Sequence, residues 1–363
     1  MPKKLSSDKV LFGVVIILVL FGIGMVYSAS AAIALELFHS SYYFLIRQIV
    51  SMVIGLLLML LLLNTDYRIF KKPFIVYPLL ALSTGMLAYL AVVSPSVGFN
   101  RWLRWGTISF QPSELAKLCL VIFLAFYLDR YREKLNDGYQ TILPILAVVG
   151  TFAILILRQP DLGTVIFIVL IAVVMMFVAG VNWKYLGGIF LSASFLFYWL
   201  IVRDHYRWKR LLAFINPWKD PLGYGFQPIQ SLIAIATGEV TGLGAGQSKQ
   251  KLFYLPAPHT DFIYSVIGEE LGLIGASVVV VAFGILMARG IRAAVKAPDQ
   301  FGTFLAAGLT LMIIFQALTN ISVALTLLPT KGLPLPFISY GGSALMVSLM
   351  AVGILLNISQ YSS

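Results

Sequence analysis

The stretch Tyr254-Leu-Pro-Ala-Pro-His-Thr-Asp-Phe-Ile-Tyr-Ser-Val-Ile-Gly-Glu-Glu-Leu-Gly272 passes from a polar loop broken by prolines into an apolar helix. It places His259, Thr260 and Asp261 at the junction and carries two adjacent acids, Glu269-Glu270, inside the apolar run. Ionisable side chains at membrane depth are costly, so they indicate a functional site by default. The competing interpretation is an ordinary helix N-terminus, where Thr260 or Asp261 caps the helix and acids favour the positive end of its dipole.

The composition of the whole chain identifies a membrane protein. Of its 363 residues, 60% are hydrophobic and 11% are charged, whereas a soluble domain has about 25% charged residues. Long apolar runs separated by short charged turns favour a helical bundle over a β-barrel. The net charge of +11 is typical of cytoplasmic loop anchoring and contact with anionic membrane lipid, so we expect no nucleic-acid partner. The single cysteine, Cys119, excludes a disulfide within the chain.

Apolar runs close to the ~20 residues that cross a bilayer recur along the chain. The expected spans are residues 10–32, 43–63, 73–93, 113–128, 141–157, 164–180, 187–202, 262–288, 301–326 and 342–358. We therefore predict an all-α membrane protein of about ten transmembrane helices with broken or re-entrant segments. The chain forms a single polytopic domain, residues 1–363, within which residues 203–261 make a long extracytoplasmic loop between spans 7 and 8.

The distribution of Lys and Arg predicts the orientation in the membrane. Basic residues concentrate in the segments that lie inside when the N-terminus is cytoplasmic, which with an even number of spans places the C-terminus inside as well. The long loop also carries basic residues, although it is predicted outside. Loops near ~60 residues obey the rule weakly, and these basic residues therefore indicate an anionic ligand.

The first outer segment, residues 98–117, ends in an ion-pair motif. Ser113 is suited to cap a helix, which places Glu114 and Lys117 three residues apart on one helix face. Because Arg101 lies near the same membrane boundary, the group indicates a charged site. The alternative is a structural ion pair at the start of a helix.

The long outer loop combines basic and aromatic residues, since Arg207 and Arg210 interleave with Tyr206 and Trp208. This mixture suits a phosphate or a lipid head group at the membrane interface. The alternative is an amphipathic interfacial helix followed by a flexible loop.

Two further segments interrupt the apolar pattern. Residues 158–163 form a short polar break, which we interpret as an ordinary turn capped by Asp161. Residues 328–343 carry three prolines and three glycines, so they cannot continue as helix and must be buried in protein or line a wet cavity. Together the four outer segments predict a cavity open to the outer leaflet, lined by cations and at least one acid.

Seven short strings together resemble the SEDS family (shape, elongation, division and sporulation) of peptidoglycan glycosyltransferases. They are Phe110-Gln-Pro-Ser-Glu-Leu-Ala-Lys117, Gln230-Ser231, Gly246-Gln-Ser-Lys-Gln-Lys251, Tyr254-Leu-Pro256, His259-Thr-Asp-Phe-Ile263, Gly268-Glu-Glu-Leu-Gly272 and Pro334-Leu-Pro-Phe-Ile-Ser-Tyr-Gly-Gly-Ser343. The similarity runs from the first span to the last. Residues 246–256 and 328–333 are more similar to the division branch of the family than to its elongation branch.

The resemblance implies a processive polymerase of lipid II at the outer face of the bacterial cytoplasmic (inner) membrane, with undecaprenyl pyrophosphate as leaving group. It implies a class B penicillin-binding protein as transpeptidase partner and a divalent cation, Mg²⁺ or Mn²⁺, whose ligands the sequence does not assign. The family's catalytic acid falls on Asp261, and its boundary acid and base fall on Glu114 and Lys117. The chain departs from the family at Ala257-Pro258, where Glu-Ala is common, so that acid is absent here.

Our mechanistic hypothesis makes Asp261 the general base that takes the proton from the 4-hydroxyl of the acceptor sugar. The acceptor oxygen then attacks the donor's anomeric carbon with inversion. A carboxylate at the start of a helix is expected to stay ionised. The candidates for binding the substrate and its pyrophosphate are Arg101, Glu114, Lys117, Arg207, Arg210, His259, Thr260 and Ser339.

Three alternatives to a division polymerase stay open. One is a polymerase of the elongation type. The second is a flippase for lipid II, which needs a path to the cytoplasmic side, and Arg47 and Gln48 in the second span are candidates to line it. The third is a scaffold that only activates its transpeptidase. The acids and helix breaks gather on the outer side, which disfavours the flippase.

Overall fold

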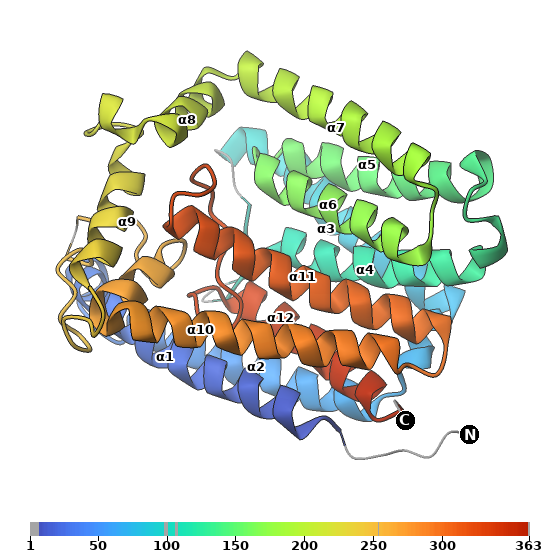
Figure 1. Cartoon of the computed structure of the whole chain (residues 1–363), viewed down its shortest axis with the longest axis horizontal. Coiled ribbons are helices and arrows are strands. Elements are labelled where there is room, and N and C mark those ends of the chain that lie inside the picture. Colours follow the sequence, from blue (N-terminus) through green and yellow to red (C-terminus); the bar gives the residue numbers. More distant parts are fainter. Residues whose placement is uncertain (1–6, 98–100, 106–107, 253, 362–363) are drawn as a thin grey trace.

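The computed structural model describes residues 7–97, 101–105, 108–252 and 254–361, and this part of the chain contains twelve α-helices. They are α1 (Lys9–Phe38), α2 (Tyr43–Asn64), α3 (Pro73–Val97), α4 (Pro112–Arg130), α5 (Leu143–Leu157), α6 (Leu162–Ala179), α7 (Trp183–Arg203), α8 (His205–Ile215), α9 (Phe226–Thr237), α10 (Ile263–Val295), α11 (Gln300–Ala324) and α12 (Gly342–Ser359) (Figure 1). Single turns of 3-10 or π helix occur at Tyr67–Lys71, Arg132–Lys134, Gly138–Ile142 and Pro217–Lys219. The predicted all-α membrane fold is confirmed.

A short antiparallel hairpin between α3 and α4 was not expected from the sequence. Its strands are β1 (Leu103–Trp105) and β2 (Ile108–Phe110), with Leu103 opposite Phe110. The hairpin follows directly after Arg101, and α4 begins two residues after it. It therefore lies within the first outer segment, residues 98–117, between Arg101 and the Glu114–Lys117 pair.

Ten helices account for the predicted spans. Nine of the described helices are long and apolar enough to cross a bilayer, namely α1, α2, α3, α5 with the turn before it, α6, α7, α10, α11 and α12. The tenth is α4, whose charged residues include Glu114, Lys117 and Asp129. Almost every side chain of α4 as far as Leu128 is buried, against α3, α6 and α11. Since charges facing lipid would be costly, this helix lies inside the bundle.

Small residues allow the closest helix contacts. A Cβ at Gly353 of α12 would lie 2.6 Å from the Met59 carbonyl oxygen of α2, and one at Gly22 of α1 would lie 2.5 Å from the Phe337 carbonyl oxygen. Lipid chains are as apolar as leucine side chains, so close van der Waals packing of this kind holds membrane helices together. The contact of Gly22 also brings the non-helical residues 325–341 against α1.

Ion pairs fasten the end of the bundle that carries both termini, which we call the terminal end (Figure 1). The Asp8 carboxylate lies 2.6 Å from the Arg289 guanidinium, which ties the start of α1 to α10. Lys71 pairs with Asp129 at 2.8 Å. Both basic residues, Arg289 near the end of α10 and Lys71 between α2 and α3, lie on the side that the Lys/Arg bias predicted to be cytoplasmic.

The opposite, distal end of the bundle contains the breaks in the helices. Residues 325–341 between α11 and α12 form no helix, as predicted. Helix α10 has a kink at Gly272, whose φ is +64°. The two backbone N–H groups after the kink donate to the loop: Leu273 to the Glu239 carbonyl at 2.9 Å and Ile274 to the Val240 carbonyl at 3.2 Å. The long loop thus satisfies the groups that the kink frees.

The long loop is folded, which differs from the flexible loop that was considered as part of the alternative. It contains α8, the amphipathic interfacial helix that was considered, and α9, which was not predicted. Ser231 on α9 is fully buried, and its hydroxyl is 2.6 Å from both the Ser265 hydroxyl and the Ala324 carbonyl oxygen. In Figure 1, α8 and α9 cover the distal end, and α7 lies along one edge of the bundle.

Candidate active site

Asp261 lies at the distal end, in the turn before α10. Helix α10 begins at Ile263, and its N-cap residue is Phe262, whose side chain makes no cap. The competing interpretation, in which Thr260 or Asp261 caps this helix, is therefore wrong. Asp261 is half-buried, and a Cβ at Gly332 would lie 2.8 Å from its Oδ2 atom. Glycine at position 332 thus leaves room for the carboxylate.

Hydrogen bonds from residues 325–341 hold the backbone next to Asp261. The Ser339 hydroxyl donates to the Thr260 carbonyl at 2.6 Å, and the Tyr340 N–H donates to the His259 carbonyl at 2.8 Å. Ser339 also accepts the Leu335 N–H at 2.8 Å. The hydroxyl of Ser339 therefore orders two segments of backbone, and its contact with substrate stays a prediction.

The charge state of Asp261 is set by burial against several cations. Burial raises the pKa of Asp261 from 3.8 to about 6, whereas Arg210, Arg101 and Lys331 oppose this rise and Asp161 adds to it. The group is therefore ionised above about pH 6. The cause is the balance of desolvation and nearby charge, and not the helix dipole that the sequence suggested.

Arg101 is fixed by the turn between α5 and α6. It donates to the Gln159 carbonyl at 2.9 Å and to the Pro160 carbonyl at 2.8 Å, and its guanidinium lies 4.0 Å from the Asp161 carboxylate. Asp161 caps α6 by accepting the Thr164 N–H at 3.0 Å, as predicted. An apparently ordinary turn therefore presents a cation to the site.

Lys331 is a cation of this group that our interpretation of the sequence did not include among the site residues. Its stem lies over Gly163 of α6, where a Cβ would come within 1.3 Å of Cε. Burial lowers the pKa of Lys331 to about 8, and Asp161 opposes that fall. A lysine inside a segment broken by prolines and glycines, predicted on the outer side, was the signal that could have identified it.

Glu114 and Lys117 form a buried ion pair in α4, with 3% and 1% of their side chains exposed. The Lys117 ammonium lies 2.9 and 2.8 Å from the two Glu114 oxygens and 2.7 Å from Gln316 Oε1. It also lies 4.9 Å from the centre of the Phe167 ring. The geometry is that of the structural ion pair considered above, and contact of either residue with substrate stays a prediction.

The two predicted arginines of α8 differ in position. Arg210 lies over the Tyr206 ring and donates to the Thr330 carbonyl at 3.3 Å, next to Lys331. Arg207 pairs with Asp204 at 3.1 Å instead. The structure therefore brings Arg210 to Asp261, whereas Arg207 is engaged by the N-cap residue Asp204 and by the Leu200 carbonyl of α7, to which it donates at 3.5 Å.

His259 and Thr260 flank the acid without forming a proton relay. The His259 ring packs 4.6 Å from the Phe44 ring, and burial lowers its pKa to about 4, so the imidazole is neutral at pH 7. Its Nδ1 atom is buried with no hydrogen-bond partner in the described chain. The Thr260 hydroxyl lies 3.3 Å from the Ala257 carbonyl oxygen. Substrate contact by either residue stays a prediction.

The acids Glu269 and Glu270 hold the long loop and lie outside the cation group. Glu269 accepts the Ser248 hydroxyl and, at 2.9 Å, the Lys249 N–H. Glu270 pairs with Lys251 at 2.7 Å. These two acids in the apolar run are thus explained by their loop partners.

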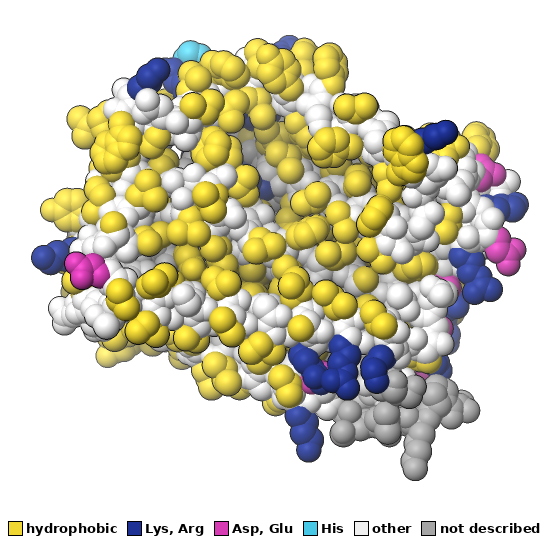
Figure 2. Space-filling model, in the orientation of Figure 1, with side chains coloured by type: hydrophobic (Ala, Val, Ile, Leu, Met, Phe, Trp, Pro, Cys, Tyr) yellow, Lys and Arg dark blue, Asp and Glu magenta, His cyan; other side chains and the backbone are white. Residues whose placement is uncertain are grey.

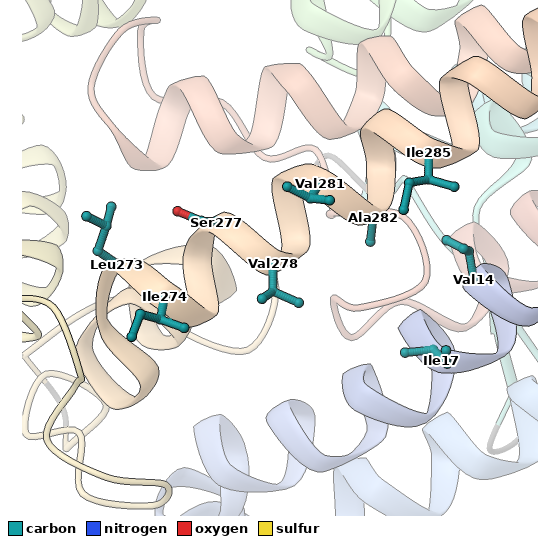
Figure 3. Close-up of a pocket in the computed structure, with 9 residues that line it drawn as sticks. All are labelled: Val14, Ile17, Leu273, Ile274, Ser277, Val278, Val281, Ala282 and Ile285. Atoms are coloured by element: carbon teal, nitrogen blue, oxygen red, sulfur yellow. The ribbon is translucent and has the colours of Figure 1, made fainter.

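The surface shows where ligands could approach. Figure 2 shows a hollow between the α7 edge and helices α10 and α11, with Lys or Arg atoms visible inside it. A separate groove of about 560 Å³ lies between α1 and α10 (Figure 3). It is lined by Val14, Ile17, Leu273, Ile274, Ser277, Val278, Val281, Ala282 and Ile285. Ser277 supplies the only polar side chain in that lining. The groove suits hydrocarbon and offers no charged group for chemistry.

The donor groups fit a divalent cation only when a substrate supplies further oxygens. Within the part of the chain that the structure describes, no three His, Cys, Asp or Glu side chains gather into a metal site. Mg²⁺ commonly binds through one or two carboxylates together with substrate phosphates. Asp261 is a carboxylate suited to this, and the cation stays a prediction.

The fold and the site define a polytopic α-helical membrane protein with a recessed acid among cations at one face. The chain belongs to the FtsW/RodA/SpoVE family, described as cell cycle proteins, which matches residues 8–363. The resemblance inferred from the motifs is confirmed.

Individual relatives cover almost the whole chain. It is 42% identical over 353 residues to the probable peptidoglycan glycosyltransferase FtsW of Geobacter sulfurreducens, covering 97% of this chain and 95% of that protein. It is also 42% identical over 368 residues to stage V sporulation protein E of Bacillus subtilis, covering 99% of each.

Solved structures share the fold. A chain of a peptidoglycan synthase complex that coordinates polymerization and crosslinking has a TM-score of 0.80 at 30% identity, covering 99% of this chain and 100% of that chain. The rod shape determining protein RodA of Thermus thermophilus has a TM-score of 0.72 at 28% identity, covering 99% of this chain and 98% of that chain.

Proposed function

We propose that this protein is a peptidoglycan glycosyltransferase that polymerises lipid II at the outer face of the cytoplasmic membrane, in cell division. The observation that carries the proposal is Asp261, half-buried and surrounded by the charges of Arg101, Arg210 and Lys331 at one end of the bundle. An acid and several cations at a membrane boundary suit a lipid-linked sugar pyrophosphate. The names of the relatives, a peptidoglycan glycosyltransferase and a peptidoglycan synthase complex, support glycosyl transfer in peptidoglycan synthesis.

Asp261 acts as general base in the proposed reaction. Its carboxylate accepts the proton of the acceptor's 4-hydroxyl while the acceptor oxygen forms a bond to the anomeric carbon of the donor. The bond from that carbon to the pyrophosphate oxygen breaks, and its electron pair leaves with undecaprenyl pyrophosphate, so the anomeric configuration inverts. Because the pKa of Asp261 is about 6, the carboxylate is ionised at pH 7 and its basicity is higher than that of an ordinary aspartate.

The cations stabilise the charge that grows on the leaving group. Arg101, Arg210 and Lys331 reach this site from three separate parts of the chain, the α3–α4 connection, α8 and residues 325–341. Fixed cations aimed at developing negative charge lower the barrier because they need no reorganisation during the reaction. A divalent cation, Mg²⁺ or Mn²⁺, would add charge on the pyrophosphate beside Asp261.

The proposal includes an orientation and a partner. We place both termini in the cytoplasm, because the basic terminal end follows the positive-inside rule and the site then faces outward. We expect a class B penicillin-binding protein as transpeptidase, which the peptidoglycan synthase complex with a similar chain supports. The division role rests on the FtsW-named relatives, and an elongation or sporulation role is the alternative to test in cells.

The contacts of Arg47 and Gln48 do not support the flippase alternative. Gln48, a candidate to line a path through the membrane, is buried and donates to the Ser339 carbonyl at 3.1 Å while accepting the Gly341 N–H at 3.3 Å. Arg47 lies 4.3 Å from the Tyr43 ring, near the distal start of α2. Both residues therefore make their contacts at the distal end of the bundle.

The test is glycan synthesis from lipid II by the purified protein, alone and with a class B penicillin-binding protein. We expect Asp261→Asn to abolish polymer, and Asp204→Asn, which keeps a helix-capping residue at the paired acid of α8, to retain it. Full activity of Asp261→Asn would remove the base from the mechanism. Vesicles with lipid II in one leaflet test the flippase alternative, because a flippase would move lipid II to the other leaflet. Activation of the transpeptidase without synthesis of polymer would favour the scaffold alternative.

A further inference from the structure

Two buried carboxamides on α11, Gln316 and Asn320, connect the parts of the candidate site. They stand four residues apart and thus on one helix face, and they are 3% and 1% exposed. Burying an amide costs free energy unless its hydrogen bonds are made. The partners of these two side chains therefore indicate why they are present in an otherwise apolar span.

Asn320 joins the segment of Asp261 to the broken segment. Its Nδ2 atom donates one hydrogen to the Asp261 carbonyl at 2.9 Å and the other to the Leu333 carbonyl at 2.8 Å. Leu333 follows Gly332, the residue against which the Asp261 carboxylate lies. One amino group therefore fixes both sides of the contact between the acid and residues 325–341.

Gln316 makes the corresponding connection one turn earlier. Its Nε2 atom donates to the Pro334 carbonyl at 3.0 Å, the carbonyl next to that of Leu333. Its Oε1 atom accepts the Lys117 ammonium at 2.7 Å. The buried Glu114–Lys117 pair of α4 is thereby tied to Pro334, the residue that follows the Leu333 held by Asn320.

We propose that Asn320 and Gln316 are positioning residues, which fix Asp261 and Lys331 relative to the Glu114–Lys117 pair through the consecutive carbonyls of Leu333 and Pro334. The inference rests on the proposed role of Asp261 as base. The Leu333 and Pro334 carbonyls lie outside any helix, and the donors that order them are the side chains of Asn320 and Gln316. An amide supplies two hydrogens at a fixed angle, which lets one residue order two segments.

The experiment compares two buried asparagines in the full-length protein. Asn320→Leu removes the donor to the site. Asn357→Leu is the matched control, because Asn357 of α12 is fully buried and donates to the Leu63 carbonyl at 2.8 Å while accepting the Tyr67 N–H at 2.9 Å, at the terminal end. Thermal stability, kcat and KM for lipid II, and the pH profile of kcat/KM are measured for each.

We expect both substitutions to lower stability, and only Asn320→Leu to lower kcat at unchanged KM. The loss should be about 10- to 100-fold, the effect of misplacing a reacting group by ~1 Å. The acidic limb of its pH profile should move to lower pH, because a released carboxylate gains water and its pKa falls. A purely structural role would leave that limb in place.

Equal kcat and coincident pH profiles for the two folded variants would overturn the proposal. If Asn320→Leu does not fold, Gln316→Met is tested in its place, and we expect a smaller loss of kcat with the acidic limb again moved to lower pH. A Gln316→Met variant with wild-type kcat and an acidic limb at the wild-type pH would overturn the proposal. Failure of the proposed function is distinct, since it requires that the wild-type protein make no polymer or that Asp261→Asn stay active.

Discussion

The polymerase should lose activity in acid with a midpoint near pH 6, well above the range of an ordinary carboxylate. Burial raises the pKa of Asp261 to about 6, and only the ionised form can accept the acceptor's proton. At pH 5 a group of pKa 6 is ionised to about a tenth, so kcat/KM should be about a tenth of its plateau. An aspartate with an unperturbed pKa near 3.9 would retain more than nine-tenths of the plateau at that pH.

Initial rates of glycan formation from lipid II between pH 5 and pH 8, at substrate concentrations well below KM, measure this limb for the free enzyme. The folded state is checked at each pH by thermal unfolding, so that loss of structure is not mistaken for protonation. A plateau that continues unchanged to pH 5 would refute the assignment of Asp261 as a buried general base. A limb that persists in a partly active Asp161→Asn variant would exclude the neighbouring acid as its source.

Three further outcomes follow from the same geometry. Asp261→Asn should stabilise the protein above pH 6 by up to about 3 kcal/mol. The reason is that the pKa of Asp261 in the native state is raised from 3.8 to about 6, so the native state disfavours the charged carboxylate. Thermal unfolding should show that this gain in stability vanishes below about pH 4. Arg210→Gln should move the acidic limb to higher pH and raise KM, whereas Arg207→Gln should leave the limb in place, because Arg207 pairs with Asp204. Gly163→Val should lower kcat on the order of 100-fold by displacing the lysine stem that lies over it, and Gly150→Val, where a Cβ meets no atom within 4 Å, should not.

The helical bundle and the side of the membrane on which the site lies could be predicted, because both depend on local sequence patterns. Apolar runs near ~20 residues determined the spans, including α4, whose charges are concentrated at its two ends. The Lys/Arg bias placed Arg101, Arg210 and Asp261 on one side, and the structure brings these three together. Charge at a membrane boundary is costly enough to stand out in sequence.

What could not be predicted depends on which partner each polar group finds in space. Gln316 and Asn320 belong to no recognisable sequence motif. An amide side chain within an apolar span gives the same sequence pattern whether it holds a loop by hydrogen bonds or packs in the core. The cap considered at Thr260 or Asp261 is not formed, and the hydroxyl of Ser339, from a distant segment, holds that turn instead. Likewise, nothing local distinguishes Arg207 from Arg210, which lie in one helix and have different partners.

The acidic residues in and around the candidate site therefore divide into two kinds, according to whether their oxygens have hydrogen-bond donors. Glu269, Glu270 and the Glu114–Lys117 pair are buried with their oxygens bound by hydroxyl, ammonium or backbone N–H donors; removing one partner would leave an uncompensated charge, at a cost of about 3–5 kcal/mol. Asp261 differs, because among the described residues no donor is bonded to its carboxylate, and it stays partly exposed. A buried charge with all its partners is already stabilised in the resting protein, whereas one without them stays basic enough to take a proton from substrate. The same incompleteness makes Asp261 costly for stability and suitable for the reaction.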